Sequence, residues 1–263
     1  SCPASPDETI GEYHAGSTHI TFNSLKQYGL FKSRVEEYNA LHPEAGVSCG
    51  VRINPQCQVV ETGIYNPCAP GSRFGITADE INGNLPEGIE GFHFHALCES
   101  SSFDLEKVLD SVESNFGKYL PSLKWINMGG GHLMTRTGYD TGHLVNLLKG
   151  FKDRYPNLHI ILEPGSAFTW QTGDLVSKVV DIVTNRGINT AIADVSFACH
   201  MPDCLEMPYK PRITGACQEP DYSKPTYRIG GNSCRSGDFG GDWSFEKPLE
   251  VNDILVFEDM NHY

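Results

Sequence analysis

The sequence predicts an α/β fold in which a parallel sheet is followed by a mostly antiparallel β domain. Five apolar runs of strand length occur in the first 163 residues, and segments with helical periodicity separate most of them. Such alternation, at roughly thirty residues per unit, is typical of parallel strands joined by right-handed crossovers. From about residue 167 the chain changes to β-branched runs divided by Pro, Gly, Asn and Asp. This change predicts two domains, 1–166 and 167–263.

Each element of the first domain is predicted from a local pattern. The expected strands are short and apolar: 19–23, 46–53, 91–97, 123–128 and 158–163. The clearest helix follows Ser102, where apolar residues recur at three-to-four spacing and predict one buried face: Phe103, Leu105, Val108, Leu109, Val112 and Phe116. Two more helices are expected over 24–40 and 142–155. In the second domain we expect strands at 175–183, 189–197, 226–231 and 253–259, although 175–183 alone is also compatible with a helix.

Five strand–helix units do not complete the eight of a (β/α)8 TIM barrel. Either the sheet is open, or about three units precede the first residue. The first sixteen residues show neither a start methionine nor a secretory pattern. We therefore expect a partial barrel whose early strands lie upstream of this sequence.

The composition excludes several classes of partner. The formal net charge is −13, from 33 acidic and 20 basic residues, so we expect no nucleic acid or membrane partner. A small polycationic substrate is compatible with this charge. Nine scattered cysteines do not suggest a disulfide framework and indicate a reducing cytoplasm. Cys199 and Cys204 lack a second pair of ligands at suitable spacing, so no zinc site is expected there.

His93 and His95 are two residues apart on an expected strand, so both side chains point to the same face. Such a pair can bind a metal at a strand end, with His132 as a further candidate ligand. The carboxylate at the later strand end, Glu163, lies in Glu-Pro-Gly, which is a poor setting for a metal ligand. The metal interpretation is therefore the less favoured one.

Gly129, Gly130 and Gly131 lie between an expected strand and an expected helix. Successive glycines let backbone N–H groups converge on an oxyanion, such as the phosphate of a small cofactor. If they do, Glu163 at the end of the next strand faces the flat ring of that cofactor. A glutamate beside a pyridine nitrogen keeps it protonated, and His95 is placed to stack on the ring. Together these strand ends predict pyridoxal 5'-phosphate.

Five motifs carry a family resemblance: "HFHALCES", "GGGH", "EPGSA", "GGNSCRSGD" and "FEDMNHY". In this order they resemble the alanine-racemase-type (fold type III) pyridoxal-phosphate decarboxylases. "YNPCAPGSRFG" and "CHMPDCLEMPYKP" narrow the resemblance to the carboxynorspermidine/carboxyspermidine decarboxylases. The resemblance implies a homodimer with shared active sites, which decarboxylates carboxynorspermidine and carboxyspermidine to norspermidine and spermidine in polyamine biosynthesis.

The resemblance also implies a role for individual residues. Those assigned to the cofactor are His95 on the ring face, Gly129, Gly130, Gly131 and Gly165 at the phosphate, Glu163 at the pyridinium, Arg52 beneath the cofactor and Tyr263 near its phosphate. Those assigned to the reaction and the substrate are Cys234, which serves the neighbouring subunit's site and protonates the carbanion, Asp238 in the same loop, and Asp194 and Asp203 near the distal amines. Simpler explanations stay open for three of them. Arg52 could be an ordinary ion-pair residue, Asp194 the end of a strand, and Asp203 a turn cap.

The sequence departs from the family pattern in three places. The lysine that binds the cofactor covalently belongs to the first barrel strand, upstream of this sequence, and Lys26 falls on a later unit. Ser166 stands where an acidic residue often follows Glu-Pro-Gly, and the chain stops short of the family's last strand. We therefore expect no turnover from these 263 residues alone.

Two other functions remain as alternatives to the decarboxylase. One is a non-catalytic homologue that regulates a decarboxylase by dimerising with it. The other, less favoured, is a metal-dependent barrel hydrolase that uses His93 and His95.

Overall fold

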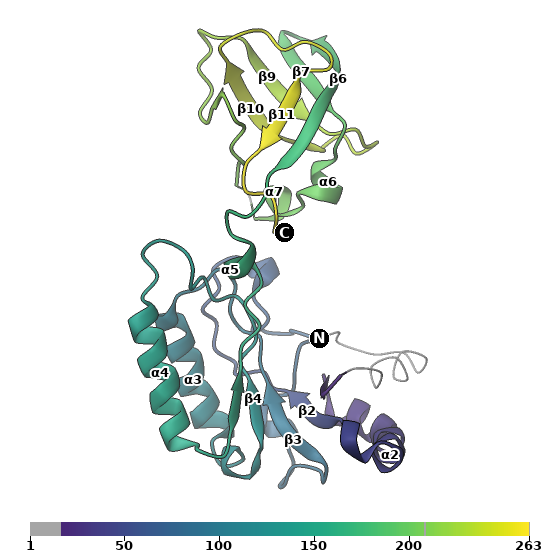
Figure 1. Ribbon diagram of the computed structural model, residues 1–263, viewed down its shortest axis with the longest axis vertical. Helices are drawn as coiled ribbons and strands as arrows, with labels where there is room; N and C mark the ends of the chain where they lie inside the picture. The colour runs from purple at the N-terminus through teal and green to yellow at the C-terminus, as the bar shows by residue number, and fades with distance from the viewer. Residues whose placement is uncertain (1–16, 208, 263) are drawn as a thin grey trace. The chain divides into compact units, whose positions relative to one another are not determined.

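The computed structural model describes residues 17–207 and 209–262. These residues form two compact units, one ending at Ala167 and the other beginning at Phe168 (Figure 1). Each unit has its own hydrophobic core. Among the described residues, no helix combines the length and the apolar character needed to cross a membrane.

The first unit is built on a parallel sheet of five strands that lie side by side in chain order. The strands are β1 His19–Phe22, β2 Ser48–Arg52, β3 Ile89–His93, β4 Trp125–Asn127 and β5 His159–Ile161. Every predicted strand is present, and the predicted α/β class is confirmed. Among the described residues β1 and β5 are the edges of this sheet, as in part of a (β/α)8 barrel.

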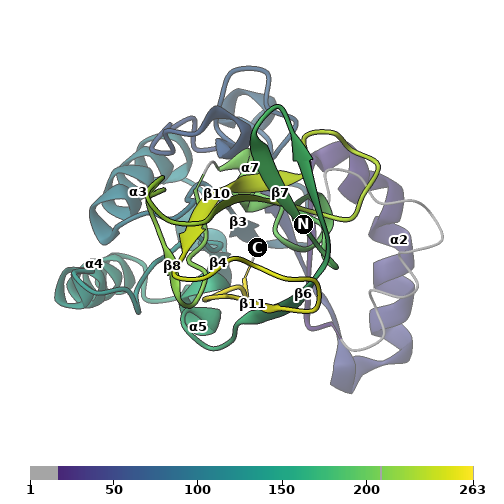
Figure 2. The ribbon, with the colours of Figure 1, turned by 90° about the horizontal axis from the view of Figure 1, so that it is seen from above.

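Within residues 17–167, three long helices accompany the sheet: α2 Leu25–Leu41, α3 Ser102–Phe116 and α4 Thr141–Arg154. Figure 1 shows α3 and α4 side by side on the sheet, and both views place α2 at the other end of this unit, near β1 (Figures 1 and 2). Each helix begins at a polar cap: Ser24, Ser101 and Asp140 accept hydrogen bonds from backbone N–H groups of the first turn. The connection from β2 to β3 holds no α-helix, only the short 3-10 turns Gly63–Tyr65 and Ala78–Glu80.

The buried face predicted for α3 is correct except at its first residue. Leu105, Val108, Leu109, Val112 and Phe116 are buried, whereas Phe103 is 49% exposed. At about 100° per residue, position 103 lies on the opposite side of the helix from position 105. Its ring stacks instead on that of His143, with centroids 4.1 Å apart.

The second unit is a six-stranded sheet in the order β11-β6-β7-β9-β10-β8, and only the β7–β9 pair is parallel. The strands are β6 Leu175–Asn185, β7 Ile188–Ala193, β8 Ala216–Cys217, β9 Thr226–Gly230, β10 Phe239–Phe245 and β11 Ile254–Phe257. The segment 175–183 is therefore part of a strand and not a helix. Arg186 and Gly187, both with positive φ, close a tight hairpin between β6 and β7.

Three short helices were not predicted: α5 Ser166–Thr169, α6 Phe197–His200 and α7 Asp203–Glu206. The strand expected over 189–197 was too long, because β7 ends at Ala193 and Phe197 begins α6. The strand β10 was missed because Gly240 and Gly241 interrupt its pattern at a β-bulge. Its Trp243 nevertheless lies at the centre of this unit's core, with 0% exposure.

Candidate cofactor site

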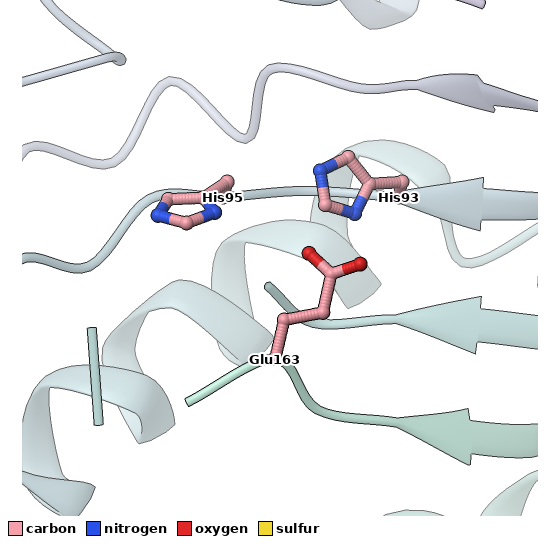
Figure 3. A group of neighbouring side chains, drawn as sticks. All are labelled: His93, His95 and Glu163. Carbon is pink, nitrogen blue, oxygen red and sulfur yellow. The ribbon is translucent and has the colours of Figure 1, made fainter. Parts of the chain in front are cut away.

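The candidate site lies at the C-terminal ends of β3, β4 and β5. His93 is the last residue of β3, Asn127 is the last residue of β4, and Glu163 follows β5 by two residues. Because the strands are parallel, these ends meet at one edge of the sheet. Figure 3 shows His93, His95 and Glu163 at this edge, with the carboxylate turned toward the His93 ring. A nitrogen of each ring and a carboxylate oxygen lie within 4.8 Å of one another.

Asn127 fixes Glu163 in this position. Its Nδ2 donates to Glu163 Oε1 at 2.8 Å, and its Oδ1 accepts from the N–H of Gly129 at 2.9 Å. The N–H of Glu163 also donates to the carbonyl oxygen of Gly129 at 2.8 Å. Sequence reasoning missed Asn127, although a polar residue at the end of the buried run "KWIN" was the available signal.

The three glycines pack tightly against both neighbouring strand ends. Gly129 and Gly131 have φ of +71° and +86°. A Cβ at Gly129 would lie 2.5 Å from the carbonyl oxygen of Phe94, and one at Gly130 would lie 2.4 Å from that of Glu163. A Cβ at Gly131 would lie 2.3 Å from the carbonyl oxygen of Leu97. The fold therefore requires glycine here whether or not a phosphate binds. The N–H of Gly130 points to Nδ1 of His95 at 3.4 Å, which links the loop to the His95 ring.

Burial and charge set the protonation of the groups around the site. Burial lowers the pKa of His93 to about 4, although the nearby Glu163 opposes this shift. Burial also lowers the pKa of His95, so both imidazoles are neutral near pH 7. Burial lowers the pKa of Arg52 to about 10, with Cys68 and Glu163 opposing, and the guanidinium still carries its charge at pH 7.

Arg52 ends β2, beside this edge of the sheet. Its side chain is 6% exposed, donates to the carbonyl oxygen of His95 at 3.3 Å, and lies over the Phe74 ring at 4.4 Å. Arg52 thus supports the segment that carries His95.

His132 follows the glycines and is almost completely buried. It is 1% exposed, and neither ring nitrogen has a hydrogen-bond partner among the described side chains and backbone. Burial lowers its pKa to about 4. It does not join the group formed by His93, His95 and Glu163.

The geometry fits the pyridine cofactor predicted from the sequence. Glu163 offers a fixed carboxylate to a ring nitrogen, and His95 offers a neutral ring beside it. The N–H groups of Gly129 and Gly130 are directed at Asn127 and His95. The side chains of His93, His95 and Glu163 could also hold a divalent cation, because Glu163 lies close to both histidines although it is part of Glu-Pro-Gly. Side-chain geometry alone does not separate the two interpretations.

The remaining predicted residues are distributed over both units. Gly165 is exposed between β5 and α5. Asp194 is exposed directly after β7 and accepts from Ser177 Oγ at 2.7 Å and from the N–H of Lys178 at 2.8 Å, as expected of a residue that ends a strand. Asp203 is the first residue of α7. Tyr263 lies outside the described residues.

Cys234 and Asp238 lie in the loop between β9 and β10, and their environments differ. Cys234 is exposed. Asp238 is 4% exposed, and its Oδ1 accepts from the N–H of Ala198 at 3.1 Å. That Asp238 faces the substrate stays a prediction.

Comparison with known proteins resolves the choice of cofactor. The family model described as "Pyridoxal-dependent decarboxylase, C-terminal sheet domain" matches residues 57–261. The chain belongs to the pyridoxal-dependent decarboxylase family. Membership in this family confirms pyridoxal phosphate as the predicted cofactor and favours it over a metal.

Two curated relatives are similar to almost the whole chain. The carboxyaminopropylagmatine decarboxylase of Synechocystis sp. is 49% identical over 247 residues, which cover 94% of this chain and 62% of that protein. The carboxynorspermidine/carboxyspermidine decarboxylase of Campylobacter jejuni is 40% identical over 271 residues, which cover 99% of this chain and 68% of that protein. The chain thus spans about two thirds of the length of these relatives, and the resemblance inferred from the motifs is confirmed.

A solved structure gives the same result for the fold. The crystal structure of carboxynorspermidine decarboxylase complexed with norspermidine, from Campylobacter jejuni, matches with a TM-score of 0.82 at 38% identity. The match covers 99% of this chain and 68% of that one. An arginine decarboxylase of Paramecium bursaria Chlorella virus, at 17% identity and a TM-score of 0.69, shows the shared fold alone.

Proposed function

We propose that the whole protein is a pyridoxal-phosphate-dependent decarboxylase of a carboxylated polyamine. The observation that carries this proposal is the Glu163 carboxylate, held by Asn127 at the strand ends beside two neutral imidazoles. When bound, the pyridine ring of the cofactor accepts the electron pair that remains as carbon dioxide leaves.

The residues of this chain would support that chemistry in distinct ways. Glu163 would hold a proton on the ring nitrogen, because a fixed negative charge favours the pyridinium form. His95 would lie against the ring face, and its pKa, lowered by burial, would keep it uncharged there. Gly129, Gly130 and Gly131 would form part of the phosphate site, and Gly165 would add a contact.

Cys234 would donate the proton that replaces carbon dioxide on the substrate carbon. In this proposal it belongs to the site of the neighbouring subunit, and the protein is a homodimer. A thiol suits this role because it is exposed on its loop and carries an S–H that can be donated. The eight described cysteines are all free, which supports a reducing compartment such as the cytoplasm.

Two substrate classes are candidates, and they differ at the end far from the carboxylate. Carboxynorspermidine and carboxyspermidine end in an amine, whereas carboxyaminopropylagmatine ends in a guanidinium. The motifs favoured the first class, but the Synechocystis relative that acts on the second is more similar, at 49% against 40% identity. Asp194 and Asp203 are proposed to receive the distal cation in either case.

The test is to assay the complete protein with all three substrates and measure carbon dioxide release. We expect one class to be preferred in kcat/KM, and a visible absorption band of the bound cofactor that borohydride abolishes. No turnover of any of the three would contradict the proposal. If the protein instead altered the activity of a separate decarboxylase by dimerising with it, the regulatory alternative would hold.

A further inference from the structure

The loop that presents Cys234 is closed at its base. The N–H of Gly231 donates to the carbonyl oxygen of Asp238 at 2.7 Å. The N–H of Asp238 donates to the carbonyl oxygen of Arg235 at 3.0 Å. Residues 232–237 are all exposed, whereas Asp238 is buried. Asp238 is therefore the one side chain of residues 232–238 that turns into the fold.

The carboxylate of Asp238 ties this loop to α6. Its Oδ1 accepts from the N–H of Ala198, the second residue of α6, at 3.1 Å. A second connection runs from the N–H of Asn232 to the carbonyl oxygen of Val195 at 2.7 Å. The loop is thus attached at both of its ends to the segment 195–198.

The carboxylate is also enclosed from the side of the loop. A Cβ at Gly231 would lie 2.3 Å from Asp238 Oδ2, so a larger residue there would displace the carboxylate from its present position. Burial would raise the pKa of Asp238, but hydrogen bonding outweighs it and lowers the pKa. The Ala198 N–H donates to Oδ1, whereas Oδ2 is buried without a hydrogen-bond partner among the described residues. The buried group is thus a carboxylate anion that α6 stabilises through Oδ1.

We propose that Asp238 is a positioning residue, whose buried carboxylate fixes the 231–238 loop against α6 and so holds Cys234 where it acts. The proposal rests on the proposed function, in which Cys234 takes part in the reaction. It gives Asp238 a role that needs no contact with the substrate, because the carboxylate is buried, with Oδ1 bound by the Ala198 N–H and Oδ2 next to Gly231.

The test compares Asp238→Ala and Asp238→Asn in the complete protein, with Asp221→Ala as a matched control. Asp221 also accepts a backbone N–H, from Ser223 at 3.1 Å in the same unit, but outside the 231–238 loop. Hydrogen exchange is measured by mass spectrometry in segments 195–201 and 231–238, with the β6–β7 hairpin as reference. Steady-state kinetics give kcat and KM separately.

For Asp238→Ala we expect exchange to be about tenfold faster in both segments, because a buried hydrogen-bond acceptor is lost. We expect kcat to fall about 10- to 100-fold, since displacement of a reacting group by about 1 Å has effects of this size, with KM nearly unchanged. Asp238→Asn keeps the shape and one acceptor, so both effects should be smaller. The control should match the unsubstituted protein.

Two results would overturn the proposal. Unchanged exchange with a raised KM would make Asp238 a substrate-binding residue, and faster exchange with unchanged kcat would show that the loop position does not matter. If Asp238→Ala does not fold, Asp238→Asn decides by the same two measurements. If the unsubstituted protein has no turnover, the proposed function fails, while the exchange rates still show whether Asp238 holds the loop.

Discussion

Glu163 is fixed by the neighbouring strand through both its backbone and its side chain. The Pro-Gly that follows could by itself explain why the strand ends, but it does not explain why the carboxylate is held by Asn127 at 2.8 Å. That hydrogen bond orders the side chain in advance, as a group that must meet a ring nitrogen requires. The buried Arg52 supplies a compensating positive charge nearby.

We expect Glu163→Gln in the complete protein to keep the cofactor but lose about 100-fold or more in kcat, since an amide supplies no negative charge for the pyridinium. Cofactor affinity and kcat should be measured together, because loss of the phosphate contacts would weaken cofactor binding first. Glu61→Gln, at an exposed position outside the site, is the control. Near-normal turnover by Glu163→Gln would refute the role given to this residue.

At the scale of elements, there are two separate reasons why the loop after β4 needs glycine at positions 129, 130 and 131. One is geometric: the loop passes so close to the ends of β3 and β5 that no Cβ fits. The other is the proposed phosphate contact. A comparison of two glycines with the same backbone conformation can isolate the geometric requirement.

Gly131→Ala should destabilise the first unit more than Gly138→Ala. Both positions have φ near +87°, which costs an alanine about 1–2 kcal/mol. A Cβ at Gly138 meets nothing within 4 Å, whereas one at Gly131 would lie 2.3 Å from the carbonyl oxygen of Leu97. Urea unfolding measures the difference. Equal losses would show that the loop relaxes easily, and would leave ligand binding as the reason for the glycine.

At the scale of the whole molecule, buried histidines make stability depend on pH. In the unfolded chain a histidine takes up a proton near pH 6.5. Burial lowers the pKa of both His93 and His132 to about 4 in the folded state, so between these values the unfolded state binds more protons. Their contribution is therefore complete above pH 6.5 and is lost as the pH falls toward 4.

We expect the free energy of unfolding to fall below pH 6.5 by up to about 1.4 kcal/mol per pH unit for each of the two histidines. Denaturant titrations between pH 7 and pH 5 measure this slope. His132→Leu should reduce it by about the share of one histidine, and His42→Leu, at an exposed position, should not. A slope unchanged by His132→Leu would mean that this ring titrates in the same way in both states.

The proposed shared site predicts complementation between two inactive variants of the complete protein. Glu163→Gln disables the first unit, and Cys234→Ala disables the loop of the second. In a mixed dimer one site combines an intact Glu163 with the partner's intact cysteine, and the other site carries both defects. Subunit exchange should restore up to about a quarter of the unsubstituted activity, since half of the dimers are mixed and each has one whole site. Verified mixed dimers without recovery would place the whole site within one chain, provided that each variant alone is severely impaired.

The sequence by itself determined the features that depend on neighbouring residues. The five strands and the buried face of α3 follow from local periodicity, and His95, Gly129 and Glu163 stand at strand ends, where parallel topology brings them to one edge. These predictions held because each rests on a few consecutive residues and on one rule of sheet geometry.

Only the tertiary structure decided the features that depend on residues far apart in the chain. Asp238 is buried, and its Oδ1 accepts a hydrogen bond from the N–H of Ala198, forty residues earlier in the chain. Glu163 is fixed by Asn127, thirty-six residues before it. The strand β10 forms in spite of its glycines because β9 and β8 pair with it from either side. Burial and hydrogen bonding of this kind arise from contacts between distant segments, and local sequence patterns do not encode which segments will meet.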